Sequence, residues 1–324
     1  MQLFTPVEIE KASSDIRHDT PVMLLGSCFS DSMAERMQSQ LFDVTANPLG
    51  TLYNPVSIRR CLEAMASGES FKEADLTQYG GLYHSFLCHS SLSRTTADDT
   101  LGAINCALAE GAQALRRASH IFLTLGTAMV YRLRADGSVV ANCHKMPQQL
   151  FDRRMLSVEE ATEALQGCMD AIRSVNPSAQ VWLTVSPIRH LSDGAHTNTL
   201  SKSTLHLAAA GIDEAHYFPA YEVVCDELRD YRFYAADMAH PSPVAADIVY
   251  ERFADCFFSE PTKTMARDCA KLVRRLAHRR LTANQEEFDR FRANTLKLAD
   301  EIILKYPTVE SALRRLLRNH NFSS

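Results

Sequence analysis

Two polar segments far apart in the chain carry residue types that are used in covalent catalysis. Gly26-Ser27-Cys28 places a hydroxyl and a thiol after an apolar run, and Asp237-Met238-Ala239-His240 places a carboxylate three residues before an imidazole. Serine or cysteine can attack a carbonyl carbon when a histidine takes up its proton and an aspartate orients that histidine. Together the two segments predict ester chemistry by a nucleophile, His240 and Asp237.

The first segment is expected at a sharp turn from a buried strand into a helix. Gly26 permits a tight turn, and free N–H groups at a helix N-terminus stabilise negative charge. A Cys28 thiolate in that position beside a histidine is expected to have a lowered pKa. The alternative is an ordinary strand-to-helix turn in which Ser27 or Ser30 caps the helix.

The second segment has a spacing that suits a catalytic pair. In a turn, a separation of three residues brings the Asp237 carboxylate to the Nδ1–H of His240, which leaves Nε2 free to accept a proton. Pro241 and Pro243 stiffen the following chain. The alternative is a capping aspartate with an incidental histidine.

These segments must be positioned by a larger framework. Short apolar runs alternate with longer stretches of helical period, which is typical of an α/β fold with a parallel sheet covered by helices. Ligands of such sheets bind at the carboxyl ends of the strands, and Gly26-Ser27-Cys28 directly follows the first predicted strand, while Asp237–His240 comes near the end of the sheet. The predicted strands are residues 21–26, 42–46, 120–125, 180–185 and 216–219, and the predicted helices lie near 30–41, 55–66, 98–118, 157–175 and 242–258.

Two regions depart from this alternation. Residues 67–94 are rich in Gly, His, Ser and aromatic residues and predict a long ordered excursion. Beyond residue 260 only helical patterns appear, at 263–280, 284–305 and 308–318. The sequence therefore predicts a main domain over 1–260 and a helical C-terminal extension over 261–324.

Charge is distributed unevenly along the chain. Residues 261–324 hold 14 Lys and Arg against 7 Asp and Glu, whereas the first 260 hold 20 against 32. A basic cluster can bind nucleic acid or a membrane, but apolar residues at helical spacing favour the solvated face of a helix that packs on the acidic body. We expect no nucleic-acid partner. The cluster comprises Lys271, Arg274, Arg275, His278, Arg279 and Arg280.

The nine cysteines are odd in number and form no C-x-x-C pair. In a long chain without a secretion signal they are expected to be reduced, and no zinc site or cofactor is predicted. The opening ten residues lack the features of a signal peptide, and no apolar run reaches membrane-spanning length. We therefore expect a cytoplasmic protein without a membrane partner.

Several segments resemble one known family. Gly26-Ser27-Cys28-Phe29-Ser30 is similar to the G-S-C-F-A signature of the GSCFA domain family, which is related to the SGNH (GDSL-like) hydrolases. The resemblance extends over roughly residues 20–258. It includes N-P-L-G-T-L-Y-N-P at 47–55, G-L-Y-H-S-F at 81–86, A-N-C-H-K at 141–145, S-P-I-R-H at 186–190 and D-Y-R-F-Y at 230–234.

This resemblance implies a flavodoxin-like three-layer α/β/α sandwich with about five parallel strands and an activity on acyl groups. It also implies a D-x-x-H pair, which Asp237 and His240 match directly. The relatives read G-D-S, with the nucleophile two positions after the glycine. That register selects Cys28, whereas residue type favours Ser27, and both remain candidates.

The oxyanion donors of the relatives are a glycine after the second strand and an asparagine in a G-x-N motif after the third. Gly50 is the counterpart of the glycine. Gly126-Thr127-Ala128 has no asparagine in register, so Thr127 or Asn142 is expected to substitute, because an oxyanion requires a hydrogen-bond donor rather than a particular side chain.

Five further polar residues lie in expected loops, and each alone is typical of a surface or hydrogen-bonded structural position. If they converge on the nucleophile, they suit a polyhydroxylated or anionic ligand. The predicted function is a metal-independent acyl ester hydrolase or acyltransferase acting on a small or carbohydrate-linked ester, and oligomerisation remains open. The alternative is a non-catalytic module that binds carbohydrate or a metabolite on a hydrolase scaffold. The five residues are His84, His89, His144, Arg189 and His190.

Overall fold

A computed structural model describes residues 5–277 and 285–319 of the 324-residue chain. The chain divides into two compact units. The sequence predicts a division near residue 260. The C-terminal segment of the second unit starts at Tyr250, and two earlier segments of the chain belong to the same unit. The first unit comprises Met1–Ile9, Val22–Met33 and Thr45–Val249, and the second comprises Glu10–Pro21, Ala34–Val44 and Tyr250–Ser324.

The centre of the fold is a five-stranded sheet in the order β10-β9-β5-β1-β2. The pairs β1–β5, β5–β9 and β9–β10 are parallel. Every residue of β1 and β5 is buried, as expected for central strands that are covered on both faces. The predicted α/β class with a parallel sheet is thus confirmed. The strands are β1 Val22–Gly26, β2 Val44–Ala46, β5 His120–Leu125, β9 Gln180–Val185 and β10 His216–Tyr217.

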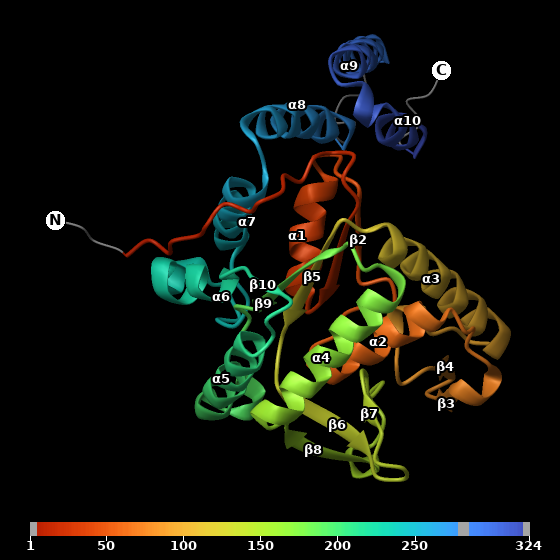
Figure 1. The fold of residues 1–324 in the computed structure, drawn as a ribbon. Helices are drawn as coiled ribbons and strands as arrows, with labels where there is room; N and C mark the ends of the chain where they lie inside the picture. The colour runs from red at the N-terminus through yellow and green to blue at the C-terminus, as the bar shows by residue number, and fades with distance from the viewer. Residues whose placement is uncertain (1–4, 278–284, 320–324) are drawn as a thin grey trace. The chain divides into compact units, whose positions relative to one another are not determined.

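Helices flank the sheet and follow its strands in the chain, as in a flavodoxin-like fold. Helices α2 and α4 lie side by side (Figure 1). Polar residues cap the starts of both helices, because Asn54 caps α2 and the Ser157/Glu160 capping box begins α4. The helices are α1 Cys28–Gln38, α2 Pro55–Ser67, α3 Ala97–Arg117, α4 Val158–Val175, α5 Ala195–Ala210, α6 Ala220–Glu222 and α7 Pro243–Phe257.

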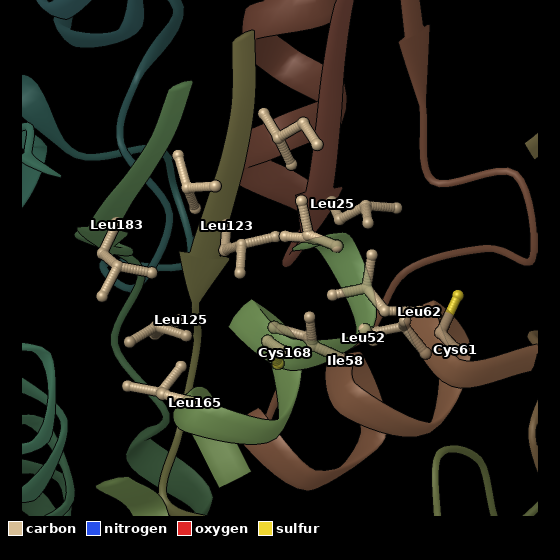
Figure 2. Close-up of a cluster of buried hydrophobic side chains, with 14 of the residues drawn as sticks. Leu25, Leu52, Ile58, Cys61, Leu62, Leu123, Leu125, Leu165, Cys168 and Leu183 are labelled. Atoms are coloured by element: carbon tan, nitrogen blue, oxygen red, sulfur yellow. The ribbon is translucent and has the colours of Figure 1, made fainter. Parts of the chain in front are cut away.

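The core of the first unit lies between the sheet and the helices. Leu25, Leu123 and Leu183 extend from β1, β5 and β9 toward Ile58 of α2 and Leu165 of α4 (Figure 2). All five side chains are almost fully buried. Removing this apolar surface from water stabilises the layered arrangement and so fixes the carboxyl edge of the sheet.

The excursion predicted at 67–94 is ordered and contains a small hairpin of β3 Thr77–Tyr79 and β4 Leu82–His84. A second antiparallel sheet was missed by the sequence predictions. Its strands are β6 Met129–Leu133, β7 Val139–Val140 and β8 Phe151–Met155, in the order β7-β6-β8. These strands are short and half-exposed, so they lack the apolar runs that marked the central strands.

Short helical turns complete the first unit. A π-helical turn occupies Val223–Leu228. Single 3-10 turns are found at Glu73–Asp75, Ser90–Leu92, Gln148–Leu150, Leu191–Asp193 and Tyr231–Phe233.

The second unit contains the helices expected after residue 260. They are α8 Glu260–Leu276, α9 Gln285–Lys305 and α10 Glu310–Asn319, with a turn at Pro307–Val309 between the last two. Their apolar core also includes Leu41, which explains why residues 34–44 belong to this unit. His278, Arg279 and Arg280 of the basic cluster lie outside the described residues.

Some basic residues of these helices form charge interactions within them. Lys271 and Lys305 both pair with Asp268, and the Arg275 guanidinium lies 5.5 Å from the Phe291 ring centroid. The nine cysteines are free thiols. Among the described residues, we find no helix with the length and apolarity needed to cross a membrane.

Gly26 provides a test of the turn that ends β1. Its φ is +130°, and a Cβ atom at this position would lie 2.1 Å from the Thr124 carbonyl oxygen. We expect Gly26→Ala to lower the free energy of unfolding by more than about 3 kcal/mol, because backbone strain adds to a clash with backbone. Thermal and urea unfolding measure this change.

Gly80→Ala is the matched control. Its φ of +59° is also unfavourable for alanine, but a Cβ atom there meets nothing within 4 Å. We expect a loss of only about 1–2 kcal/mol, which is the cost of the left-handed conformation alone. Equal losses in the two variants would show that close approach to Thr124 does not constrain this turn.

Candidate active site

The turn between β1 and α1 is held by a network of backbone and side-chain hydrogen bonds. The Gly26 N–H donates to Asn47 Oδ1 at 2.8 Å, and the Ser27 N–H donates to the Thr124 carbonyl at 3.1 Å. Asn47 Nδ2 also donates to Asp31 Oδ1 at 2.8 Å. Asn47 therefore ties the end of the strand to the first turn of the helix, and Cys28 is the first residue of that helix.

The structure separates the two candidate nucleophiles. Ser27 is only 1% exposed, and its Oγ accepts from the Phe29 N–H at 3.3 Å. Cys28 is half-buried, lines a cavity and places Sγ 3.9 Å from Nε2 of His240. Ser27 therefore caps α1, which is the alternative interpretation of this segment. Cys28, which the register of the G-D-S motif selects, is the residue whose side chain lies next to His240.

The Asp237–His240 turn has the geometry expected from its spacing. Nδ1 of His240 lies 2.6 Å from Asp237 Oδ2, and Asp237 Oδ1 accepts from the N–H groups of His240 and Ala239 at 3.0 Å each. These backbone N–H groups, and then the imidazole, hold the pKa of the Asp237 carboxyl at about 2. An ionised carboxylate at Nδ1 favours the tautomer in which Nε2 accepts a proton from Cys28.

The prediction of a lowered pKa for the Cys28 thiol is wrong. Burial raises the pKa of the thiol, and the nearby Asp31 carboxylate raises it further. The N–H groups of Cys28 and Phe29 and the charge of Lys202 act in the opposite direction but do not overcome these effects. The sequence could not reveal this outcome, because it depends on how deeply the first turn of α1 is covered. The resting thiol is protonated and requires a base.

A cavity of about 840 Å³ opens in front of Cys28 and His240. Its wall includes the unexpected β6–β8 sheet, through Met129, Tyr131 and Arg153. Of the residues predicted from the sequence, the cavity brings together Cys28, Thr127, Asn142, Arg189, His190 and His240.

The three expected oxyanion donors have different surroundings. The Gly50 N–H donates to the Asn47 carbonyl at 2.7 Å, and Gly50 does not line the cavity. Its missing side chain instead leaves room for His89, whose Cβ would lie 2.0 Å from an added Cβ. The Thr127 N–H donates to the Tyr53 carbonyl, and its hydroxyl contacts Ser201 Oγ at 3.0 Å. Asn142 lines the cavity, and its Oδ1 accepts from the His144 N–H.

Three of the five predicted ligand-binding residues lie away from the cavity lining. His84 and His144 stack with ring centroids 4.3 Å apart, and each is held by hydrogen bonds through both ring nitrogens. His89 Nδ1 lies 3.1 Å from Ser91 Oγ at the start of a 3-10 turn. These histidines hold the excursion and its neighbours in place, and only Arg189 and His190 of the five line the cavity.

The sequence predictions missed Asn54. It lines the cavity with Cys28, is 5% exposed and caps α2 through a hydrogen bond from the Ser57 N–H to Oδ1 at 2.9 Å. Oδ1 is therefore used by the helix cap, whereas Nδ2 has no hydrogen-bond partner among the described residues. The Asn-Pro pair marked the helix start but carried no sign that the amide also reaches the cavity.

The sequence predictions also missed three buried polar residues on one face of α5. Asn198 Oδ1 accepts from the His190 N–H, Ser201 Oγ accepts from the Ala128 N–H, and Lys202 Nζ donates to two backbone carbonyls. These contacts hold the loops after β5 and β9. Polar residues at positions i, i+3 and i+4 among the alanines and leucines of this helix were the available signal.

Charge in the cavity is mainly positive. Arg153 forms an ion pair with Asp193 and lies 5.2 Å from the Tyr131 ring centroid. Arg189 and Lys145 also line the cavity, and within residues 5–277 and 285–319 neither has a carboxylate partner. The same part of the chain has no group of three or more His, Cys, Asp or Glu arranged to hold a metal ion.

Comparison with known proteins places the chain in a family. A search of curated proteins gave no match. Among solved structures, the chain is similar to an acetyl xylan esterase (Est2A) from the rumen bacterium Butyrivibrio proteoclasticus, with 11% identity and a TM-score of 0.35. The match covers 78% of this chain and 64% of the esterase, which is less than two thirds of its length. The model of the GSCFA family matches residues 21–253, and the protein therefore belongs to the GSCFA family.

Proposed function

We propose that the protein is an acyl ester hydrolase or acyltransferase in which Cys28 is the nucleophile and no metal takes part. The observation that carries this proposal is the line of contacts from Asp237 Oδ2 to His240 Nδ1 at 2.6 Å and from His240 Nε2 to Cys28 Sγ at 3.9 Å. This is the order of groups in a nucleophile–base–carboxylate triad. The second distance is long, as is common before substrate binds.

In the first half of the reaction, His240 Nε2 takes the proton from Cys28 Sγ and the thiolate attacks the ester carbonyl carbon. The tetrahedral intermediate collapses to a thioester, and the leaving alkoxide receives the proton from His240. In the second half, water or an acceptor hydroxyl loses its proton to His240 and attacks the thioester. The proton then returns to Cys28 as the acid or new ester departs.

For the oxyanion we assign the Cys28 N–H and the Nδ2 group of Asn54 as donors. Within the described part of the chain, the Cys28 N–H donates to no other residue and lies at the N-terminus of α1, where the dipole favours negative charge. Asn54 lines the same cavity, and because its Oδ1 caps α2, Nδ2 is the polar group of this amide that has no partner among the described residues. Asn54 thereby replaces the asparagine of the G-x-N motif that this chain lacks, and Asn142 is a further cavity amide.

The substrate that best fits the cavity is an anionic or polyhydroxylated ester, such as an acylated sugar. Arg189 offers a bidentate contact to a carboxylate, with Lys145 as a second cation. Burial lowers the pKa of His190 to about 4, so its imidazole is neutral and suited to hydrogen bonding with hydroxyl groups. Tyr131 supplies an aromatic surface beside them.

A non-catalytic binding module remains the second candidate, because the N–H groups of Gly50 and Thr127 both donate to backbone carbonyls. Such a module would bind the same anionic or hydroxylated ligands without forming a covalent intermediate. Trapping of an acyl-enzyme therefore separates the two functions.

Reaction with p-nitrophenyl acetate tests the nucleophile. Cleavage after Arg17 and Arg36 gives a tryptic peptide of residues 18–36, in which Cys28 is the single cysteine. We expect an acetyl group on this peptide in the wild-type protein and in Ser27→Ala, and none in Cys28→Ala, because Ser27 Oγ is buried. Mass spectrometry after an acid quench measures the adduct. An adduct that persists in Cys28→Ala would contradict the proposal.

Turnover of the same ester tests the base. His240→Ala is expected to reduce kcat/KM by roughly 10²- to 10⁴-fold, which is the usual contribution of general base catalysis. His206→Ala is the control, because His206 does not line the cavity. Equal turnover by wild-type protein and His240→Ala would reject the triad.

Asn54 can be tested without removing its helix cap. Asn54→Asp and Asn54→Ser both keep an oxygen acceptor for the Ser57 N–H, but neither has the amide donor. We expect kcat to fall by roughly 10²- to 10³-fold in both, with little change in melting temperature. An oxyanion role is excluded if the neutral serine variant retains wild-type kcat.

A further inference from the structure

Lys202 is the most unusual charged residue of the first unit. It lies in the middle of α5, is 2% exposed and directs Nζ to the carbonyl oxygens of Gly126 at 2.6 Å and Ser186 at 2.7 Å. Among the residues that the structure describes, no carboxylate pairs with it. The two carbonyls satisfy two of its hydrogen-bonding positions and leave its positive charge without an anion.

Burying such a charge is unfavourable. Taking an ammonium group out of water costs several kcal/mol, and neutral carbonyls recover only part of that. The burial lowers the pKa of Lys202 to about 7, while the thiols of Cys225 and Cys28 act to raise it. An apolar side chain of similar length would fill this space at lower cost, so the charge itself requires an explanation.

The position of Lys202 supplies that explanation. Gly126 and Ser186 are the residues that follow β5 and β9, so Nζ lies at the carboxyl edge of the sheet. Strand β1 pairs in parallel with β5, with Gly26 opposite Thr124, and therefore ends at the same edge. The turn that carries Cys28 therefore follows β1, and the Gly126 carbonyl that accepts from Nζ follows the adjacent strand β5 at the same edge of the sheet.

We propose that Lys202 is the buried counter-charge of the Cys28 thiolate. The inference rests on the proposed function, in which His240 removes the proton from Cys28 Sγ. The thiolate that forms is attracted by the ammonium group, and the carbonyls of Gly126 and Ser186 hold that group at the carboxyl edge of the sheet. Lys202 is therefore a positioning residue that contacts no substrate.

Other groups around Cys28 and Lys202 also affect the stability of the Cys28 thiolate and of the Lys202 charge. Asp31 and burial both disfavour the thiolate, and the neighbouring Tyr53 hydroxyl also interacts with Cys28. Around Lys202, the imidazoles of His190 and His206 repel its charge when they are protonated. Cys225 from the π-helical turn is the other thiol near Lys202. Lys202 is the side-chain cation that lowers the pKa of Cys28.

The effect has a defined pH dependence. Below about pH 7 Lys202 carries its charge and favours the thiolate, whereas well above that pH it is neutral and this help is lost. Loss of the charge should therefore slow reactions of Cys28 at low pH and have little effect at high pH. A purely structural role of Lys202 would change the rate by a similar factor at every pH.

Alkylation by iodoacetamide measures this without any substrate. We compare wild-type protein with Lys202→Gln, which retains an amide donor for a carbonyl but has no charge, and follow the peptide of residues 18–36. At about pH 6 we expect Lys202→Gln to react roughly tenfold more slowly, equivalent to one pKa unit, and at about pH 9 the rates should converge. Ser201→Ala is the control, because it removes a hydrogen bond to the Ala128 N–H and leaves the charge in place.

Identical profiles for folded Lys202→Gln and wild-type protein would overturn the inference and leave the proposed ester chemistry intact. A uniform slowing at all pH values, or a pH-dependent slowing in Ser201→Ala, would also overturn it. Acyl trapping on Cys28 tests the proposed function separately.

If Lys202→Gln does not fold, the alkylation rates of Cys28 and Cys143 are compared within His240→Ala protein. This variant keeps Lys202 and removes the imidazole that is the proposed base for Cys28. Cys143 lines the same cavity and serves as internal reference, since burial raises its pKa to about 11. Its rate should increase tenfold per pH unit between about pH 6 and 8. We expect a shallower increase for Cys28, because Lys202 loses its charge over that range. Parallel increases would overturn the inference.

Discussion

The approach of Gly26 to the Thr124 carbonyl is the constraint on which the rest of the site depends. A side chain at this position would overlap the neighbouring strand, so β1 and β5 can remain paired up to their last residues only with glycine here. The chain then turns sharply, and α1 begins at Cys28. Asn47 stabilises the turn by binding the Gly26 N–H and the Asp31 carboxylate. The position of the Cys28 backbone directly after β1 therefore depends on glycine at position 26.

The two ionisable ends of the proposed triad lie in opposite environments. Asp237 is exposed to solvent and accepts two backbone N–H groups, so its charge is stabilised locally within one turn. Cys28 is half-buried, and its thiolate is disfavoured by burial and by Asp31. The base and the counter-charge that we propose come from distant parts of the chain, His240 from the turn before α7 and Lys202 from α5.

In this chain the Gly50 N–H donates to the Asn47 carbonyl and the Thr127 N–H donates to the Tyr53 carbonyl, so neither group is left for an oxyanion. We therefore propose the Asn54 amide, whose Oδ1 caps α2, as a donor. The small sheet β6–β8 forms part of the cavity wall, whereas the stacked His84 and His144 lie outside the lining, so a segment without the proposed catalytic groups still defines the size and charge of the site.

The alternation of the central strands with helices α1–α4 and α7, the parallel sheet and the Asp237–His240 pair were predicted from the sequence, because they depend on local periodicity and on a three-residue spacing. The proposed choice of Cys28 over Ser27 depends on tertiary structure, because it rests on which of two adjacent side chains faces His240, 212 residues away. The structural placement of His84 and His144 and the roles that we propose for Asn54 and Lys202 were likewise hidden from the sequence. Each arises from burial and long-range contacts, and neither residue type nor spacing encodes these directly.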